Sequence, residues 1–243
     1  RHFHEHPEVG HPLPQTQEYI VKMLEMYGYE NIIVNPGGSI EILVGPHDKK
    51  ILLLRSDMDA LPLVEHTNLP FKSINGSMHA CGHDGHIAIG LGVAEGIIRF
   101  KEYLSGTIKL IFQPGEESVC GGSPMAQSGI LDDVDYLLSG HIGIKARKSG
   151  EIICGTKGFL ATSKINAEFT GKSSHAAVAP EKGHNALLSA STAVLNLDAI
   201  PRNGEGITRI NVGKLIAGSG RNVIPGKAFM EVETRGETTE LNE

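Results

Sequence analysis

Four side chains that bind transition metals fall within eight residues, and this stretch constrains the fold more than any other feature. They are His79, Cys81, His83 and His86, with two glycines among them. A thiolate and an imidazole two positions apart in such a loop can turn toward one cation, and both suit zinc, manganese or a neighbouring first-row ion. Chance clustering of the 12 histidines is the plainer alternative. If the stretch does bind a metal, the chain must fold so that further donors reach it.

Further donors follow apolar runs that are typical of buried strands. The runs are 51–54, 107–112 and 134–138, and the residues after them are Asp57 and Asp59, Glu116 and Glu117, and His141. In open α/β sheets the carboxyl ends of parallel strands meet at one edge, where ligands bind. Helical patterns at 16–27 and 86–100 separate the strands. We therefore predict an α/β fold with a mostly parallel sheet.

The pattern changes near Gly158. Strand patterns at 164–170, 208–215 and 227–233 accompany helical patterns at 185–197 and from 239 onward. The order β-α-β-β-α, without a closing strand, is typical of an α+β module of the split βαβ type. We predict two domains, residues 1–157 and 158–243, of which the second is incomplete at its C-terminus.

Composition excludes several classes of partner. The net charge is −6 with dispersed Lys and Arg, which argues against a nucleic-acid groove or an anionic membrane surface. No apolar run approaches the roughly 20 residues that a membrane span needs.

Cys81, Cys120 and Cys154 lack paired spacing, which predicts no disulfide framework and a reducing, cytoplasmic setting. The chain begins at Arg1 without an initiator Met, which suggests that the numbering starts inside a longer protein.

The donor set suits a pair of metal ions. Two ions about 3.5–4 Å apart need a bridging anionic ligand; Cys81 can bridge, with His83, Glu117 and His141 as terminal ligands. Adjacent side chains of extended chain point opposite ways, so Glu117 can bind metal while Glu116 acts as general base toward water. A lone Glu-Glu pair could instead be a solvated turn. The position of Glu116 and Glu117 after a predicted buried strand disfavours that alternative.

Asp57 and Asp59 have two equally weighted interpretations. They can orient a histidine ligand from outside the metal's coordination shell. They can instead cap the segment that follows them.

Several motifs together resemble the dinuclear metallo-amidohydrolases. This aminoacylase/carboxypeptidase family includes hippurate hydrolases, auxin-conjugate hydrolases and N-acetyl-diaminopimelate deacetylases. The motifs lie at residues 3–8, 55–62, 78–86, 112–117 and 171–175. In the second domain, 183–188, 217–223 and 232–236 are most similar to the aminobenzoyl-glutamate utilisation hydrolases.

The resemblance implies a catalytic α/β domain and a smaller, ferredoxin-like lid that mediates dimerisation. It implies four metal ligands, Cys81, His83, Glu117 and His141, for two Mn²⁺ or Zn²⁺ ions, with Glu116 as the base. His175 matches a lid histidine aimed at the substrate carbonyl, often from the partner subunit. Asn222 matches a position near the substrate carboxylate, and we assign its neighbour Arg221 to substrate binding as well. The N-terminal histidines 2, 4, 6 and 11 are expected to be structural or solvent-facing.

Two departures from the family pattern stand out. Gly115 replaces an alanine that relatives usually carry. The family's last metal histidine lies about a hundred residues beyond the lid, in returning catalytic-domain chain that this sequence does not contain. We therefore expect the 243 residues to be a fragment.

We predict a metal-dependent amidohydrolase that cleaves N-acyl or N-aroyl amino acids, with aminobenzoyl-glutamate as the preferred substrate type. It is expected to form a homodimer through the lid and to bind neither nucleic acid nor membrane. One alternative is an N-acetyl-amino-acid deacetylase or a carboxypeptidase of the same family. Others are a cysteine hydrolase that uses Cys81 and His83, and a non-catalytic binding or assembly subunit.

Overall fold

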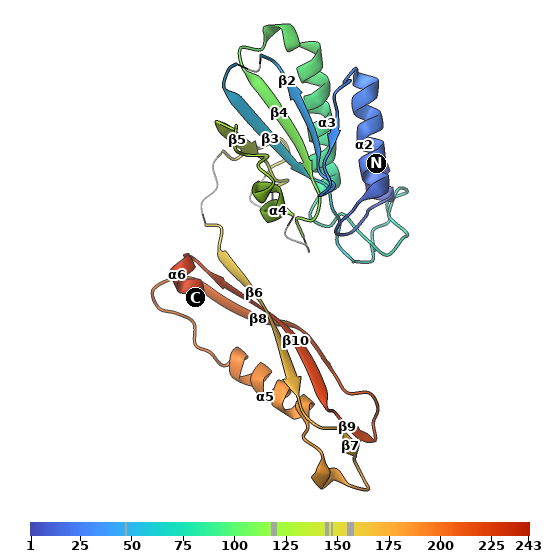
Figure 1. Ribbon diagram of the computed structural model, residues 1–243, viewed down its shortest axis with the longest axis vertical. Helices are drawn as coiled ribbons and strands as arrows, with labels where there is room; N and C mark the ends of the chain where they lie inside the picture. The colour runs from blue at the N-terminus through green and yellow to red at the C-terminus, as the bar shows by residue number, and fades with distance from the viewer. Residues whose placement is uncertain (47, 118–120, 144–145, 147, 155–157) are drawn as a thin grey trace. The chain divides into compact units, whose positions relative to one another are not determined.

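The chain divides into two compact units, Arg1–Ala146 and Arg147–Glu243 (Figure 1). The computed structural model describes all residues except 47, 118–120, 144–145, 147 and 155–157. The boundary expected from the sequence, between 157 and 158, adjoins residues outside the described ones. The assignment of a catalytic domain and a lid with those bounds stays a prediction.

The first unit alternates strands and helices. Its elements are α1 (His2–Glu5), α2 (Pro14–Tyr27), β1 (Ile33–Val34), β2 (Ile40–Val44), β3 (Ile51–Asp57), α3 (His83–Arg99), the 3-10 helix η1 (Lys101–Tyr103), β4 (Thr107–Gln113), α4 (Gly122–Gln127) and β5 (Tyr136–Ser139). Its sheet has the order β1-β2-β4-β3-β5. β3 is parallel to both β4 and β5, whereas β2 is antiparallel to β4 and β1 to β2. The predicted α/β fold is confirmed, and its parallel strands are those that lead to the candidate site.

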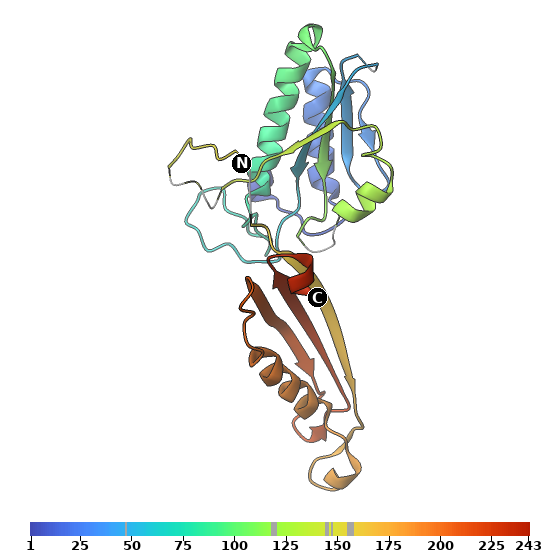
Figure 2. The same cartoon turned by 90° about the vertical axis from the view of Figure 1, so that its left-hand side faces the viewer.

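Apolar side chains cover both faces of this sheet. Helices α2 and α3 pack on one face, as Figures 1 and 2 show, and bury Ile20, Leu24, Ile87, Leu91, Ile40, Leu110 and Phe112. Full burial of such a side chain is worth about 1.5–3 kcal/mol. Gly90 allows α3 to approach the sheet closely, because a Cβ there would lie 2.8 Å from the Phe112 ring. On the other face Leu53 and Ile111 pack with Ile130 and with Met125 of α4.

Three element ends differ from the predicted ones, each for a local reason. Helix α2 begins at Pro14, because proline suits the first helical position and the Glu8 carboxylate accepts the backbone N–H of Thr16 at 2.7 Å. Helix α3 begins at His83, directly after Gly82 in the left-handed conformation. Strand β3 continues through Asp57, because its pairing with β4 extends to Gln113.

The second unit is an α+β module. Its elements are β6 (Ala161–Thr170), β7 (Ser174–His175), the 3-10 helix η2 (Pro180–Lys182), α5 (Ala186–Asp198), β8 (Thr208–Ala217), β9 (Val223–Ile224), β10 (Lys227–Gly236) and α6 (Thr239–Asn242). β6, β10 and β8 form an antiparallel sheet in that order, and β7 pairs with β9. The predicted order of elements is confirmed.

Helix α5 lies along one face of the three-stranded sheet (Figure 2). The small side chains of Ala186 and Ala190 pack there on Ala228 of β10. Asn185 begins the helix by accepting the Leu188 N–H with its side-chain oxygen at 3.2 Å, as N-cap residues do. The described helices include none with the length and apolar character that a membrane crossing requires.

Candidate metal centre

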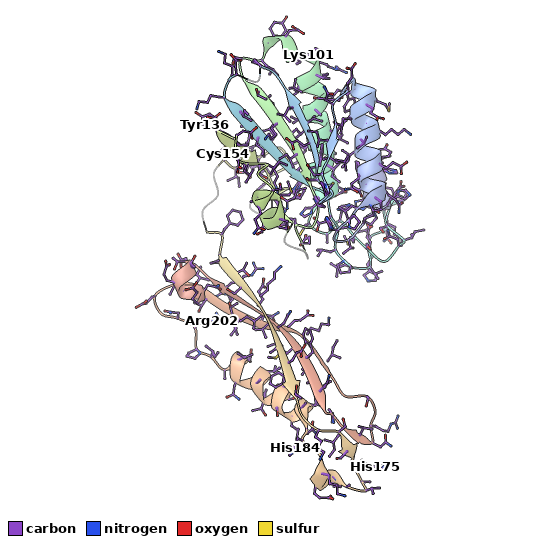
Figure 3. All side chains as sticks on the ribbon, viewed as in Figure 1. Lys101, Tyr136, Cys154, His175, His184 and Arg202 are labelled. Atoms are coloured by element: carbon purple, nitrogen blue, oxygen red, sulfur yellow. The ribbon has the colours of Figure 1, made fainter. Side chains whose placement is uncertain are left out.

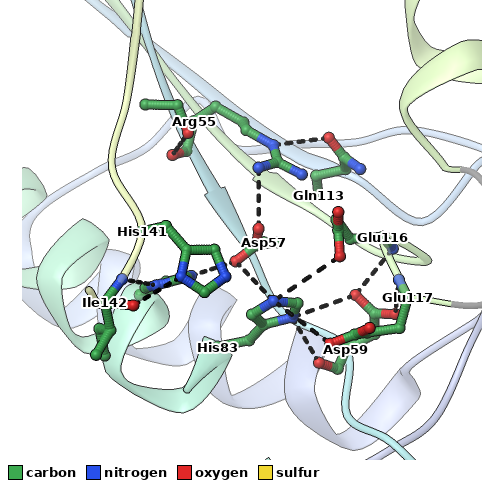
Figure 4. A network of polar contacts seen from close by, with 11 residues as sticks. Arg55, Asp57, Asp59, His83, Gln113, Glu116, Glu117, His141 and Ile142 are labelled. Carbon is green, nitrogen blue, oxygen red and sulfur yellow. Dashed lines mark hydrogen bonds and ion pairs between the residues drawn. The ribbon is translucent and has the colours of Figure 1, made fainter. Parts of the chain in front are cut away.

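The candidate donors meet at one edge of the first unit's sheet. Asp57 ends β3, Glu116 and Glu117 follow β4, and His141 follows β5. Because these three strands are parallel neighbours, the polar residues that follow them come together, and the first residue of α3, His83, lies among them (Figure 4).

His83 presents one nitrogen to the centre of this cluster. Its ring is buried, and its Nδ1–H donates to the backbone carbonyl of Asp59 at 2.8 Å. That bond leaves the lone pair on Nε2. Nε2 lies 3.6 Å from Asp57 Oδ1, 3.9 Å from Glu117 Oε1 and 4.0 Å from Glu116 Oε2. It has no hydrogen-bond partner among the described residues, so it is available to a cation.

His141 and Cys81 form with His83 a group whose donor atoms lie close together. His141 Nδ1–H donates to the Ile142 carbonyl at 2.8 Å, which again leaves the lone pair on Nε2. One donor atom each from Cys81, His83 and His141 lie within 4.8 Å of one another, as do donor atoms of His83, Glu116 and Glu117. All four predicted ligands therefore belong to two groups that share His83.

These residues fit a divalent cation. Within the described chain, the buried atoms His83 Nε2 and Glu117 Oε1 both lack a hydrogen-bond partner, and such unpaired buried groups are costly unless something binds them. Burial lowers the pKa of His83, but the Asp59 side chain and the Asp57 charge outweigh it and raise that pKa overall. The cluster thus favours positive charge. Imidazole, thiolate and carboxylate together suit Zn²⁺ or Mn²⁺.

The environment of Cys81 disfavours a free thiolate. Burial, followed by the adjacent Glu117 carboxylate, raises the pKa of Cys81 to about 12. The cysteine-hydrolase alternative needs a thiolate, which this surrounding opposes in the absence of a cation. Cys81 and Cys154 are free thiols, and Cys120 lies outside the described residues.

Asp57 and Asp59 form hydrogen bonds with residues of the donor cluster and next to it. Asp59 accepts the backbone N–H groups of Glu116 and Glu117, each at 2.9 Å. Asp57 Oδ1 accepts from His86 Nδ1, and its Oδ2 lies 2.9 Å from Arg55 Nη1. Burial raises the pKa of Asp57, but these partners outweigh it and lower that pKa overall. Asp57 thus bonds to a histidine and Asp59 to the turn that carries the glutamates; their role beside a metal stays a prediction.

The Glu116–Glu117 pair does not lie in extended chain. It follows Gly115, whose φ is +67°, and the two residues form a bend in which both carboxylates approach His83. The expectation of oppositely directed side chains is therefore wrong for this turn. The two still differ in surroundings: the Glu116 side chain is 43% exposed and that of Glu117 is 15% exposed. Glu116 lines a hollow of about 290 Å³ with Arg55, Gln113 and Ser123.

The other predicted site residues gather at one end of the second unit, where Figure 3 labels His175. His175 pairs with Val223, and Asn222 accepts the Ala176 N–H through its carbonyl at 3.0 Å. His175 Nδ1 accepts from the backbone N–H groups of Ala177 and Val178 at 3.2 and 3.1 Å, so its Nε2–H is a donor. Arg221 lines a hollow of about 560 Å³ beside these residues.

Sequence reasoning assigned no role to Arg55 and Gln113, and it counted His86 only as one of four metal-binding residue types in the stretch from His79 to His86. Arg55 Nε donates to Gln113 Oε1 at 2.9 Å, which joins the ends of β3 and β4. The spacing of His86, three residues after His83 on one helix, was the available signal, because residues i and i+3 share a helix face. Which lone pair each histidine keeps depends on tertiary hydrogen bonds, so the sequence alone could not supply it.

The N-terminal histidine His4 is structural, as expected. It bridges Asp84 at 2.8 Å and the buried carboxylate of Glu65 at 3.1 Å. Burial lowers the pKa of His4, but these two hydrogen bonds outweigh it and raise that pKa. The bridge ties the N-terminal helix to the loop that precedes the cluster.

The chain is similar to proteins of a known family. Residues 53–232 match the model of the peptidase family M20/M25/M40. The chain is 49% identical over 201 residues to one of the subunits of p-aminobenzoyl-glutamate hydrolase from Escherichia coli, and the match covers 79% of this chain and 46% of that protein. The chain therefore spans about half the length of this curated relative.

Two solved structures share the fold. The aminobenzoyl-glutamate utilization protein from Klebsiella pneumoniae is 33% identical with a TM-score of 0.77, covering 100% of this chain and 66% of that one. The YXEP protein of Bacillus subtilis, described as a dinuclear metal binding peptidase, is 29% identical with a TM-score of 0.67, covering 98% of this chain and 63% of that one.

Proposed function

The chain belongs to the peptidase family M20/M25/M40, and from this premise we propose that the protein hydrolyses the amide bond of N-acyl or N-aroyl amino acids with the help of divalent metal. One observation carries the proposal. The lone pairs of His83 and His141, the Cys81 thiol and the Glu117 carboxylate converge where three parallel strands end. The similarity to aminobenzoyl-glutamate proteins supports the substrate class.

Cys81, His83, Glu117 and His141 would hold the metal, with Cys81 as the bridge if two ions bind. The Bacillus subtilis relative, described as dinuclear, supports two ions, and the donors suit either Mn²⁺ or Zn²⁺. When bound there, such an ion would lower the pKa of a water ligand and polarise an amide carbonyl.

Glu116 is the proposed general base. Its carboxylate adjoins the donor cluster but faces the hollow beside Arg55, where substrate and water have access. It would remove a proton from the attacking water and deliver it to the leaving amine nitrogen. General-base groups contribute about 10²–10⁴-fold to rate.

The second unit would bind the far end of the substrate. His175 keeps an Nε2–H donor that can stabilise the oxyanion of the tetrahedral intermediate. Arg221 supplies a positive charge at its hollow, and its neighbour in the chain, Asn222, carries an amide. Both suit the carboxylate of an amino acid such as glutamate. We propose that this unit is the lid and dimerises, so that His175 serves the partner's site in a cytoplasmic homodimer.

Hydrolysis of p-aminobenzoyl-glutamate tests this function. The polypeptide should be assayed as residues 1–243 and as the longest open reading frame that contains them, with metal, with chelator and after metal is returned. We expect p-aminobenzoate release that chelator abolishes and metal restores, and that Glu116→Gln suppresses. Metal binding without release from this or any N-acetyl amino acid would instead support a binding or assembly subunit.

A complementation experiment tests the role of His175. Inactive Glu116→Gln subunits mixed with inactive His175→Ala subunits should recover part of the activity through hybrid dimers. If subunits exchange and activity does not return, His175 acts in its own subunit or has no catalytic role.

A further inference from the structure

A fifth potential donor, His86, lies among the candidate ligands, but its hydrogen bonds differ from theirs. Its side chain is buried with 3% exposure. Its ring stacks on His83 at 5.2 Å and meets His141 edge-on at 4.6 Å. Donor atoms of Asp57, His83 and His86 also lie within 4.8 Å of one another, so distance alone would make His86 a ligand.

Both ring nitrogens of His86 are already bonded within the protein. Nε2 lies 2.8 Å from the backbone nitrogen of Ile142. A backbone N–H can only donate, so Nε2 accepts and keeps no lone pair for a metal. The proton of the neutral ring is then on Nδ1, which donates to Asp57 Oδ1.

All three rings carry the proton on Nδ1, and His86 differs from the two predicted histidine ligands at Nε2. His83 and His141 each donate Nδ1–H to a backbone carbonyl, and among the described residues the Nε2 lone pair of each has no hydrogen-bond partner. His86 instead uses its Nε2 lone pair to accept the backbone N–H of Ile142. The hydrogen bonds therefore distinguish the three adjoining histidines. His83 and His141 can act as metal ligands, whereas His86 can only support them.

The bond from Ile142 to His86 connects directly to His141. Ile142 donates its N–H to His86, and its carbonyl accepts from His141 Nδ1. The same residue is thus held at one end by His86 and orients the His141 ring at the other. His141 is exposed, so packing does not fix the orientation of its ring. The hydrogen bond to the Ile142 carbonyl does.

Arg55 and Asp57 fix the other side of His86. The Asp57 carboxylate has one oxygen on His86 and the other at 2.9 Å from Arg55 Nη1. Arg55 is in turn anchored to Gln113. An anionic carboxylate that faces Nδ1 holds the proton there, which keeps Nε2 as the acceptor.

We propose that His86 is a positioning residue that orients the metal ligand His141 through Ile142, and that Arg55 and Asp57 hold His86 in the tautomer this requires. The inference rests on the metal site of the proposed function. It assigns His86 to the support of the site and removes it from the ligand set. Outer partners of this kind typically change metal affinity by about 10–100-fold.

Two substitutions of His86 separate hydrogen bonding from packing. His86→Phe keeps a ring of similar shape but removes both nitrogens, and His86→Gln can still accept from Ile142 and donate to Asp57. His6→Phe is the matched control, since His6 is exposed, directly follows α1, and in the described contacts its side chain hydrogen-bonds only to the His2 carbonyl. Co²⁺ affinity, circular dichroism and ¹⁵N NMR of the histidine rings are measured for each.

We expect His86→Phe to remain folded and to lose about 10–100-fold in Co²⁺ affinity, with His141 populating both tautomers. His86→Gln should recover most of the loss, and His6→Phe should match wild type. Wild-type affinity and an unchanged His141 tautomer in folded His86→Phe would overturn the proposal, as would equal losses in the Phe and Gln variants.

The wild-type spectrum is decisive even if His86→Phe does not fold, because a proton on His86 Nε2 contradicts the proposal outright. None of these measurements uses a substrate. A protein with the expected tautomers and Co²⁺ affinity that cleaves no amide would refute the proposed function and leave this inference standing.

Discussion

The two adjacent glutamates should respond in opposite ways to the same substitution. Gln keeps the size of Glu and removes its charge, and both backbone N–H bonds to Asp59, 2.9 Å each, are independent of the side chain. Glu116→Gln should lower kcat by about 10²–10⁴-fold, equivalent to about 3–5 kcal/mol of transition-state stabilisation. Metal affinity should stay near wild type.

Glu117→Gln should instead lose metal. Its carboxylate is 15% exposed and carries a buried oxygen without a hydrogen-bond partner in the described part of the chain. Neutralising an unpaired buried charge removes a desolvation cost. The metal-free variant should therefore be as stable as wild type or more stable, while added metal should raise its melting temperature less, since stabilisation follows RT ln(1 + [L]/Kd).

Thermal melts with and without Zn²⁺, combined with kcat on p-aminobenzoyl-glutamate, distinguish the pair. The assignments would be reversed if Glu116→Gln lost metal and Glu117→Gln lost only rate. A metal-free Glu117→Gln protein clearly less stable than wild type would refute the reasoning from its unpaired oxygen.

Three further outcomes follow from named contacts. Cys81→Ser should weaken metal binding, because a neutral hydroxyl is a poorer bridge than a thiolate; unchanged metal content at unchanged affinity would exclude a ligand role. Gly90→Ala should destabilise the fold by about 1–3 kcal/mol, as measured by urea unfolding, because its Cβ would lie 2.7–2.8 Å from sheet side chains. Two groups should give a stability plateau between pH 4.5 and 6.5, their ordinary pKa values: Glu65, whose pKa the Thr67 hydroxyl lowers most, and His4, whose pKa burial lowers but Asp84 and then Glu65 raise overall. The raised pKa of His4 adds stability that is lost as pH rises through that pKa, and the pKa of Glu65, lowered to about 2, adds stability that is lost as pH falls toward it. His4→Gln should remove the alkaline decline in urea-measured stability, and an unchanged decline would exclude the bridge as its cause.

The parts of the site that depend on strand order were predictable from the sequence. Apolar runs that are followed by Asp57, Glu116 and His141 predict strands of a mostly parallel sheet, and β3 is parallel to both β4 and β5. The composition of the His79–His86 stretch likewise indicated metal chemistry. The strands could be predicted because apolar runs and residue types are local properties of the sequence, whereas the metal ligands stay a prediction.

The parts that depend on tertiary hydrogen bonds were not predictable. The bend after Gly115 brings both glutamates toward His83, and Asp59 holds that bend through two backbone N–H groups. His86 has the residue type of a ligand, yet its Nε2 is committed to Ile142. In each case a hydrogen-bond partner distant in sequence decides the role of the side chain. The spacing of residues in the sequence does not reveal that partner.

A Co²⁺ titration followed by absorption spectroscopy tests the central claim most directly. The fold places the Cys81 thiol and the lone pairs of His83 and His141 around one point. We predict saturable Co²⁺ binding with a thiolate-to-cobalt charge-transfer band that grows in proportion to bound metal. Saturable binding without that band, or no specific binding by any form of the protein that contains these residues, would contradict the claim.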